Sequence, residues 1–141
     1  MKIEKDMTIG VLAKKSGVTV ETVKFYEKVG VLPKPQRPSS GFRTYPLDYV
    51  SRILFIKRAQ ELGFTLREVK ELLKLKVDKK ATCGHVMKKA DEKILEVEKK
   101  IKDLQQMKKS LKQIRECCED GTQSLTDCPI LECFETTGGC Q

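Results

Sequence analysis

Six cysteines are the residues of this sequence best suited to chemistry, and all lie in the C-terminal half of the chain. No signal peptide or stretch of secretory length precedes them, so we expect a cytoplasmic protein in which thiols stay reduced. In that setting cysteines gathered in one half of a chain favour metal binding over structural disulfide bonds. The last two lie on a short tail, and we expect them to be accessory. The six are Cys83, Cys117, Cys118, Cys128, Cys133 and Cys140.

Cys83 and Cys118 occupy equivalent positions in the heptad repeat of the segment that joins them. They lie 35 residues apart, which is five heptads, so both fall on about the same stripe of a coiled coil. A helix rising 1.5 Å per residue separates them by roughly 50 Å, so one chain cannot bring both to one ion. In an antiparallel pair, Cys83 of one protomer faces Cys118 of the other. Cys128 follows a loop over residues 119–127 that lets the chain fold back.

Cys83 from one protomer, with Cys118 and Cys128 from the other, would form a three-thiolate site at each end of a dimer. Sulfur ligands favour soft divalent ions such as mercury, lead, cadmium or zinc over magnesium and calcium. Zinc requires a fourth ligand, for which Cys117, His85 or a water molecule is a candidate. The alternative interpretation is that the cysteines are small apolar residues of a helix seam. The matched spacing argues against it for Cys83 and Cys118.

A long amphipathic helix must position these cysteines. From Thr82 to about Cys118 there is no proline, and the only glycine, Gly84, lies in the first turn. Apolar residues recur at spacings of three and four, which is the pattern of a coiled-coil seam. Such a helix cannot bury its seam alone, so we expect a second copy of the chain and a two-fold symmetric homodimer. The seam consists of Val86, Ala90, Ile94, Val97, Ile101, Leu104, Met107, Leu111, Ile114 and Cys118.

The charge of the chain points to a polyanion as the partner of its first half. Residues 1–77 carry 16 Lys and Arg against 8 Asp and Glu, so the whole net charge of +8 lies there. This asymmetry favours DNA, although a solvated basic face has the same composition. An enzyme is the least expected class, because the single histidine lacks a catalytic arrangement and no Gly-rich phosphate loop occurs. No apolar run reaches the roughly 20 residues of a membrane span.

Two short helices predict how the basic half would bind DNA. Residues 9–16 and 20–28 are each amphipathic and are joined by a three-residue turn containing glycine, as in a helix-turn-helix. The second helix is then placed to enter a major groove. Its polar or polar-tipped side chains, which we expect to contact DNA, are Thr22, Lys24 and Tyr26.

A short hairpin is predicted next, over residues 36–45. Its arms carry Arg37, Arg43 and Tyr45. A basic hairpin beside a helix-turn-helix is suited to grip phosphates as a wing, which we favour over an ordinary surface hairpin.

Two further helices complete the head, over residues 47–62 and from 66 to about 76. A capping box, Thr65 with Glu68, starts the second of them. Lys57 on the first would reach phosphates or lie on a solvated face. The predicted fold is mainly α-helical, with three parts. These are a winged helix-turn-helix head (1–77), a dimerisation coiled-coil helix (78–118) and a metal-binding loop with its tail (119–141).

With these residues in view, the chain resembles the MerR family, and specifically its metal-responsive branch of mercury-resistance and zinc-responsive regulators. The resemblance covers nearly the whole chain. Its most specific stretches are 22–32 (TVKFYEKVGVL), 41–45 (GFRTY), 55–66 (FIKRAQELGFTL) and the frame Cys83, Cys118, Cys128 followed by Pro-Ile-Leu.

The resemblance implies a cytoplasmic transcriptional regulator of a metal-resistance promoter. In that family the head grips a promoter whose elements are spaced too far apart, and metal binding distorts the DNA so that RNA polymerase can use it. The resemblance also implies that Cys83 places the chain among sensors of divalent ions, because copper(I) sensors of the family carry Ser there. The choice among mercury, zinc, cadmium and lead stays open. The alternative function is a thiol redox sensor of the same fold.

Overall fold

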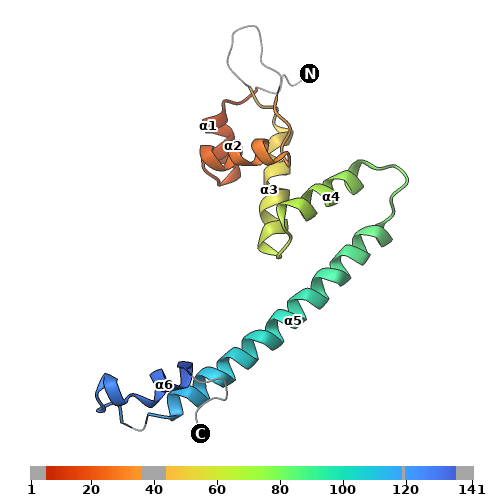
Figure 1. Ribbon diagram of the computed structural model, residues 1–141. Coiled ribbons are helices and arrows are strands. Elements are labelled where there is room, and N and C mark those ends of the chain that lie inside the picture. The colour runs from red at the N-terminus through yellow and green to blue at the C-terminus, as the bar shows by residue number, and fades with distance from the viewer. Residues whose placement is uncertain (1–5, 36–43, 119, 136–141) are drawn as a thin grey trace. The chain divides into compact units, whose positions relative to one another are not determined.

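The computed structural model describes residues 6–35, 44–118 and 120–135, and within these ranges the regular elements are all helices (Figure 1). Two compact units are present, residues 1–93 and 94–141. The first unit therefore continues past residue 77, the end of the predicted head, through the first turns of the long helix. No helix in the described part of the chain is long and apolar enough to cross a membrane.

Four helices form the head, close to the predicted ranges. Threonines begin three of them: the hydroxyls of Thr8, Thr19 and Thr65 accept a hydrogen bond from a backbone N–H of the first turn. Thr65 and Glu68 form the predicted capping box. The helices are α1 (Ile9–Ser16), α2 (Val20–Val29), α3 (Asp48–Glu61) and α4 (Leu66–Val77).

The core of the head lies where α1 and α2 pack together and α3 packs against α1 and α4 (Figure 1). Gly17 turns the chain between α1 and α2 with a φ of 68°, a left-handed conformation that glycine adopts without strain. Beyond Val31 and Leu32, which join the core, the chain returns at Tyr45, whose backbone forms an antiparallel bridge with Met7. Fully buried side chains of the core are Leu12, Val23, Val31, Leu32, Tyr45, Ile53, Ile56 and Val69.

The long helix α5 (Cys83–Glu116) is attached to α4 by two ion pairs. Lys93 Nζ lies 2.9 Å from Glu68 Oε1, and its side chain also lies over the ring of Phe64. Lys93 is only 7% exposed, whereas the side chain of Glu68 is 32% exposed, so the pair is shielded from water on the lysine side. Lys89 pairs with Glu71 at 2.7 Å in a more exposed position. Glu68 thus caps α4 and holds α5 at the same time.

Helix α5 is continuous over 34 residues, as the absence of proline predicted. Seven apolar side chains of its seam are between 40% and 61% exposed in the single chain. These are Val86, Ile94, Val97, Ile101, Leu104, Met107 and Leu111. Beyond α5, the sequence predicted only a loop and a tail, but the structure has a short 3₁₀ turn, η1 (Leu125–Asp127), and a helix, α6 (Pro129–Glu135). Pro129 occupies the first position of α6, where its missing N–H costs nothing.

The capping interaction predicts an acid-sensitive link between α4 and α5. The backbone N–H of Thr65, and then the ammonium of Lys93, lower the pKa of Glu68 from 4.5 to about 2. Because folding lowers this pKa, ionised Glu68 stabilises the fold above pH 4.5, and that contribution is lost as the pH falls toward 2. We expect Glu68→Gln to lower the free energy of unfolding by about 1 kcal/mol at neutral pH, and by progressively less in acid, measured by thermal melts.

Glu71→Gln is the matched control, because Glu71 pairs with Lys89 at the surface and caps no helix. It should change the melting temperature little at any pH. Equal pH profiles for the two variants would contradict the role assigned to Glu68.

Candidate DNA interface and metal ligands

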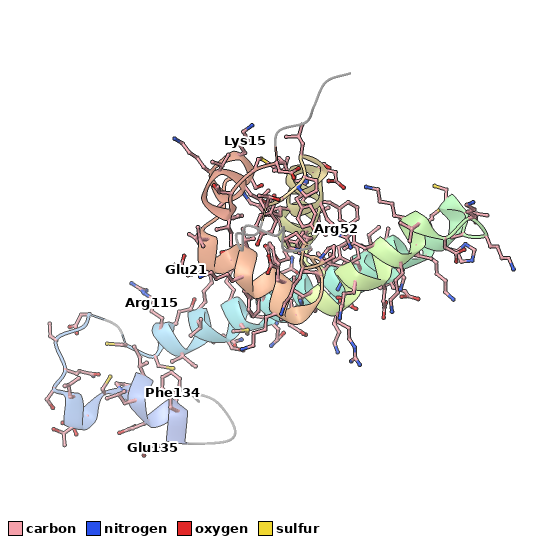
Figure 2. All side chains as sticks on the ribbon, turned by 90° about the horizontal axis from the view of Figure 1, so that it is seen from above. Lys15, Glu21, Arg52, Arg115, Phe134 and Glu135 are labelled. Carbon is pink, nitrogen blue, oxygen red and sulfur yellow. The ribbon has the colours of Figure 1, made fainter. Side chains whose placement is uncertain are left out.

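One face of α2 is turned to solvent and is the candidate DNA-reading surface. Lys24 is exposed and Thr22 half-buried, so both predicted contact residues are accessible. Thr22 also shares a 2.9 Å hydrogen bond between hydroxyls with the capping residue Thr19. Glu21 is exposed on the same helix, and Lys15 is exposed on α1 (Figure 2). A side chain on such a face can reach base edges or phosphates without unfolding the head.

Phe25 is a candidate contact that the sequence did not suggest, because only the polar or polar-tipped side chains of this helix were expected to contact DNA. In the structure it is 50% exposed. Residues 21, 24, 25 and 28 follow the helical repeat and lie opposite buried Val23, which is the signal that would have found it. An exposed phenyl ring suits apolar contact with a thymine methyl group in a major groove.

The two tyrosines predicted to contact DNA are buried, which corrects that assignment for their side chains. Tyr26 is 4% exposed, and its hydroxyl donates to Gln60 Oε1 at 2.8 Å. Tyr45 is 0% exposed, and its hydroxyl donates to the buried carboxylate of Glu27. Burial also raises the pKa of Tyr26. Both rings pack the core of the head behind the exposed face of α2, rather than offering a surface to DNA.

The remaining predicted DNA contacts are Lys57, Arg37 and Arg43. Lys57 is half-buried, and its ammonium donates to the carbonyl of Gly17 at 3.2 Å. It therefore caps the end of α1, where the helix dipole favours a cation. Arg37 and Arg43, with most of the predicted wing, lie outside the described residues, so their contacts with DNA stay predictions.

Cys83 is the first residue of α5 and is an exposed free cysteine. It lines an open, largely apolar groove of about 430 Å³ between α4 and the start of α5, with Phe55, Leu72 and Val86 among its walls. His85, one of the candidate fourth ligands, accepts a hydrogen bond at Nδ1 from the backbone N–H of Thr82, at 3.0 Å. In this state that nitrogen caps the helix and is not available to an ion.

Cys118 and Cys128 are half-buried free cysteines at the two ends of the loop after α5. The backbone N–H of Cys118 still bonds the carbonyl of Arg115, so it lies on the last turn leaving the helix. Cys128 ends η1, and its carbonyl accepts from Glu132 N, so it leads into α6. Among the described residues of the single chain, no three Cys, His, Asp or Glu side chains gather as a metal site. The three-thiolate site across two copies stays a prediction.

Cys133 has a more definite place than the accessory role expected for it. On α6 it is 9% exposed, and its sulfur lies 3.7 Å from that of Cys117 at the end of α5. Cys117 was proposed as a fourth ligand of the shared site, and the structure pairs it with Cys133. Cys140 lies outside the described residues.

Comparisons with known proteins agree with this architecture. The family model described as MerR HTH family regulatory protein matches residues 7–76, and the model described as MerR, DNA binding matches residues 50–114. Together they span the head and nearly all of α5.

Curated relatives and solved structures extend the likeness over most of the chain. The mercuric resistance operon regulatory protein of Bacillus cereus is 40% identical over 124 residues, which cover 88% of this chain and 93% of that protein. The HTH-type transcriptional regulator ZntR of Escherichia coli K12 is 37% identical, covering 90% and 91%. The crystal structure of the transcription regulator PbrR691 from Ralstonia metallidurans CH34, in complex with lead(II), has a TM-score of 0.81 and 36% identity, covering 89% and 97%.

The division between exposed and buried side chains predicts different effects of Lys24→Ala and Tyr45→Phe. Removing the exposed Lys24 ammonium should weaken binding to a duplex selected from random DNA by about tenfold and make the salt dependence shallower. Tyr45→Phe leaves the Glu27 carboxylate without the hydrogen bond from Tyr45 and should lower the free energy of unfolding by about 1–3 kcal/mol. Fluorescence anisotropy with labelled DNA and chemical denaturation measure the two quantities.

In the folded state, well below its melting temperature, the Tyr45→Phe protein should bind that duplex almost as tightly as the native one. If Tyr45→Phe instead lost much of its DNA affinity while its free energy of unfolding stayed unchanged, Tyr45 would be a direct DNA contact after all.

Proposed function

The chain belongs to the MerR family of helix-turn-helix regulators, and on that premise we propose that it regulates transcription in response to a soft divalent metal. Transcriptional regulation is the function of its family, and its relatives include proteins named for resistance to mercury. The observation that carries the metal response is the placement of three free cysteines: Cys83 begins α5, Cys118 lies just past its end, and Cys128 follows the loop after it.

The head supplies the DNA-binding part of this function. MerR-family regulators bind promoter DNA and function as dimers. In this chain the accessible side chains of α2, Thr22, Lys24 and Phe25, form the surface that would read a major groove. A dimer would place two such helices on one promoter, and distortion of the DNA between them would let RNA polymerase use its elements.

The exposed seam of α5 supports the dimer. Seven large apolar side chains at coiled-coil spacing lie at least 40% open to solvent in the single chain, and a second α5 would bury them. An antiparallel pairing that sets residue 83 opposite residue 118 places the two-fold axis between residues 100 and 101. Each end of such a dimer then holds Cys83 of one copy near Cys118 and Cys128 of the other.

The donor set of this shared site suits a soft ion. Cys83, Cys118 and Cys128 offer three sulfur ligands and no competing hard oxygen ligand in the set. A bound ion would supply cross-links between the loop of one copy and the start of α5 in the other. Binding requires the three thiols to lose their protons, so the apparent affinity should fall as the pH falls.

The first turns of α5 connect the shared site to the head. Cys83 begins the helix, and Lys89 and Lys93 tie its next turns to Glu71 and Glu68 of α4. Because Lys93 is almost fully buried in this link, α4 would follow a displacement of α5 rather than slip past it. Ordering of the partner's loop against Cys83 can therefore change the orientation of the head on DNA.

The position of the two-fold axis predicts the effect of a charge on the seam. In the antiparallel dimer, Ile101→Lys would bring two ammonium groups close together and remove two buried side chains. We expect the dimer dissociation constant to rise at least about 100-fold, because each buried aliphatic side chain contributes about 1.5–3 kcal/mol. Gln106→Lys, at an exposed position on the side of α5 opposite the seam, should leave the sedimentation profile dimeric. An unchanged dimer in the Ile101 variant would contradict this pairing.

A mixed dimer tests whether the site is shared. One copy carries Cys83→Ser, and the other carries Cys118→Ser with Cys128→Ser, so neither homodimer has a complete site. The antiparallel model predicts that the mixed dimer regains one complete site, and with it part of the metal-dependent transcription measured in vitro. Both homodimers should bind promoter DNA but show no response to zinc, cadmium, lead or mercury. A mixed dimer that responds no better than its parents would refute the shared site.

A further inference from the structure

Glu21 is an exposed carboxylate on a surface that otherwise carries positive charge. Helices α1 and α2 together contain four lysines, and their two acids are Glu21 and Glu27. Glu27 is buried and accepts a hydrogen bond from the hydroxyl of Tyr45, so it belongs to the core of the head. Glu21 is exposed in the first turn of α2 (Figure 2), and within the described part of the chain its side chain takes part in no ion pair.

Helix geometry places Glu21 and Phe25 side by side at the centre of the exposed face of α2. With 3.6 residues per turn, each of them lies about 160° around the helix from Val23, which is 0% exposed. Residues four apart on a helix are neighbours, so the carboxylate and the 50% exposed ring of Phe25 form one continuous surface. This surface lies on the N-terminal half of α2, which is the part of a recognition helix that contacts base edges.

The chemistry of a carboxylate restricts which base it can contact. Phosphates repel Glu21, so a favourable contact with DNA has to come from a base edge. In the major groove, cytosine offers its N4 amino group as a donor, and a carboxylate accepts from it. Guanine and thymine offer acceptors there, and adenine places an acceptor beside its amino group, so these bases fit a carboxylate less well. Phe25 has no hydrogen-bonding group, and its ring suits the methyl group of thymine.

We propose that Glu21 reads a cytosine, and Phe25 a nearby thymine, in each half-site of the DNA that this chain binds. The two residues are about 6 Å apart along the helix axis, and base pairs are stacked about 3.4 Å apart, so the two bases lie one or two base pairs from each other. A two-fold dimer repeats the pair in inverted orientation in the second half-site. This inference rests on the DNA-binding part of the proposed function and adds the bases that the head selects.

An exchange of the carboxylate for an amide tests the contact of Glu21. Duplexes selected from random DNA by the full-length dimer identify the half-site. Glutamine pairs with N6 and N7 of adenine, so Glu21→Gln should change the preferred base at one position from cytosine to adenine, by about tenfold in relative affinity. The other positions should keep their preference. If Glu21 only stabilised the start of α2 through the helix dipole, the preferred base would not change.

Glu61→Gln is the matched control, because it also removes one exposed negative charge from the head but lies on α3. It should leave the selected sequence unchanged. Thermal melts of both variants show that the heads remain folded.

The same contacts are tested with the native protein by changing the DNA. A 2-pyrimidinone nucleotide in place of the cytosine lacks the N4 amino group and should weaken binding about tenfold. Deoxyuridine in place of the thymine lacks only the methyl group and should weaken binding about fourfold, the contribution of one buried methyl group. The Phe25→Ala protein should bind the thymine and deoxyuridine duplexes equally.

The outcomes separate this inference from the proposed function. Identical base preferences of the native and Glu21→Gln proteins would overturn the contact of Glu21, and equal binding of the thymine and deoxyuridine duplexes by the native protein would overturn that of Phe25. A native protein that selects no common sequence would overturn both contacts together with sequence-specific DNA binding. A protein that selects this half-site without any transcriptional response to metal would refute the metal response alone and leave both contacts standing.

Discussion

The helix α5 imposes the constraint on which the proposed function of this chain depends. It runs unbroken for 34 residues, so at 1.5 Å per residue its ends are about 50 Å apart. Its apolar seam is open to solvent along most of that length. Burial of the seam by a second copy would be favourable, and it would also bring distant cysteines together. The proposed dimer and the proposed metal site both depend on this one helix.

The contact between α4 and α5 gives that helix a mechanical connection to the DNA-binding head. Glu68 accepts the capping hydrogen bond of Thr65 and also pairs with Lys93, whose ammonium lies over the ring of Phe64. One carboxylate therefore fastens the beginning of α4 and a turn of α5. Because Cys83 begins α5 about three turns earlier, a change at this cysteine has a short path to the head.

Some features of the head and its candidate DNA interface could be predicted from the sequence, and others could not. The threonine caps and the helices of the head followed from local signals and agree with the structure. Thr22 and Lys24 lie on an accessible face of α2, and their contact with DNA stays a prediction. Tyr26 was assigned to DNA because its phenol is polar at the tip, and Tyr45 because it lies on an arm of the predicted wing. Their rings instead fill the core, and their hydroxyls bond Gln60 and Glu27. The local sequence pattern does not show whether a tyrosine hydroxyl donates to a buried acceptor or to water.

The sequence by itself determined the helices of the head, the long helix with its apolar seam, the basic charge of the head and the family, since capping residues and apolar periodicity act over one or a few turns. Tertiary structure alone decided that Lys93 pairs with Glu68, that Lys57 caps α1, and that Cys133 lies beside Cys117. These pairs are 16 to 40 residues apart in the chain. No periodic pattern links such positions, because their proximity depends on how separate helices pack, and only the folded chain supplies that.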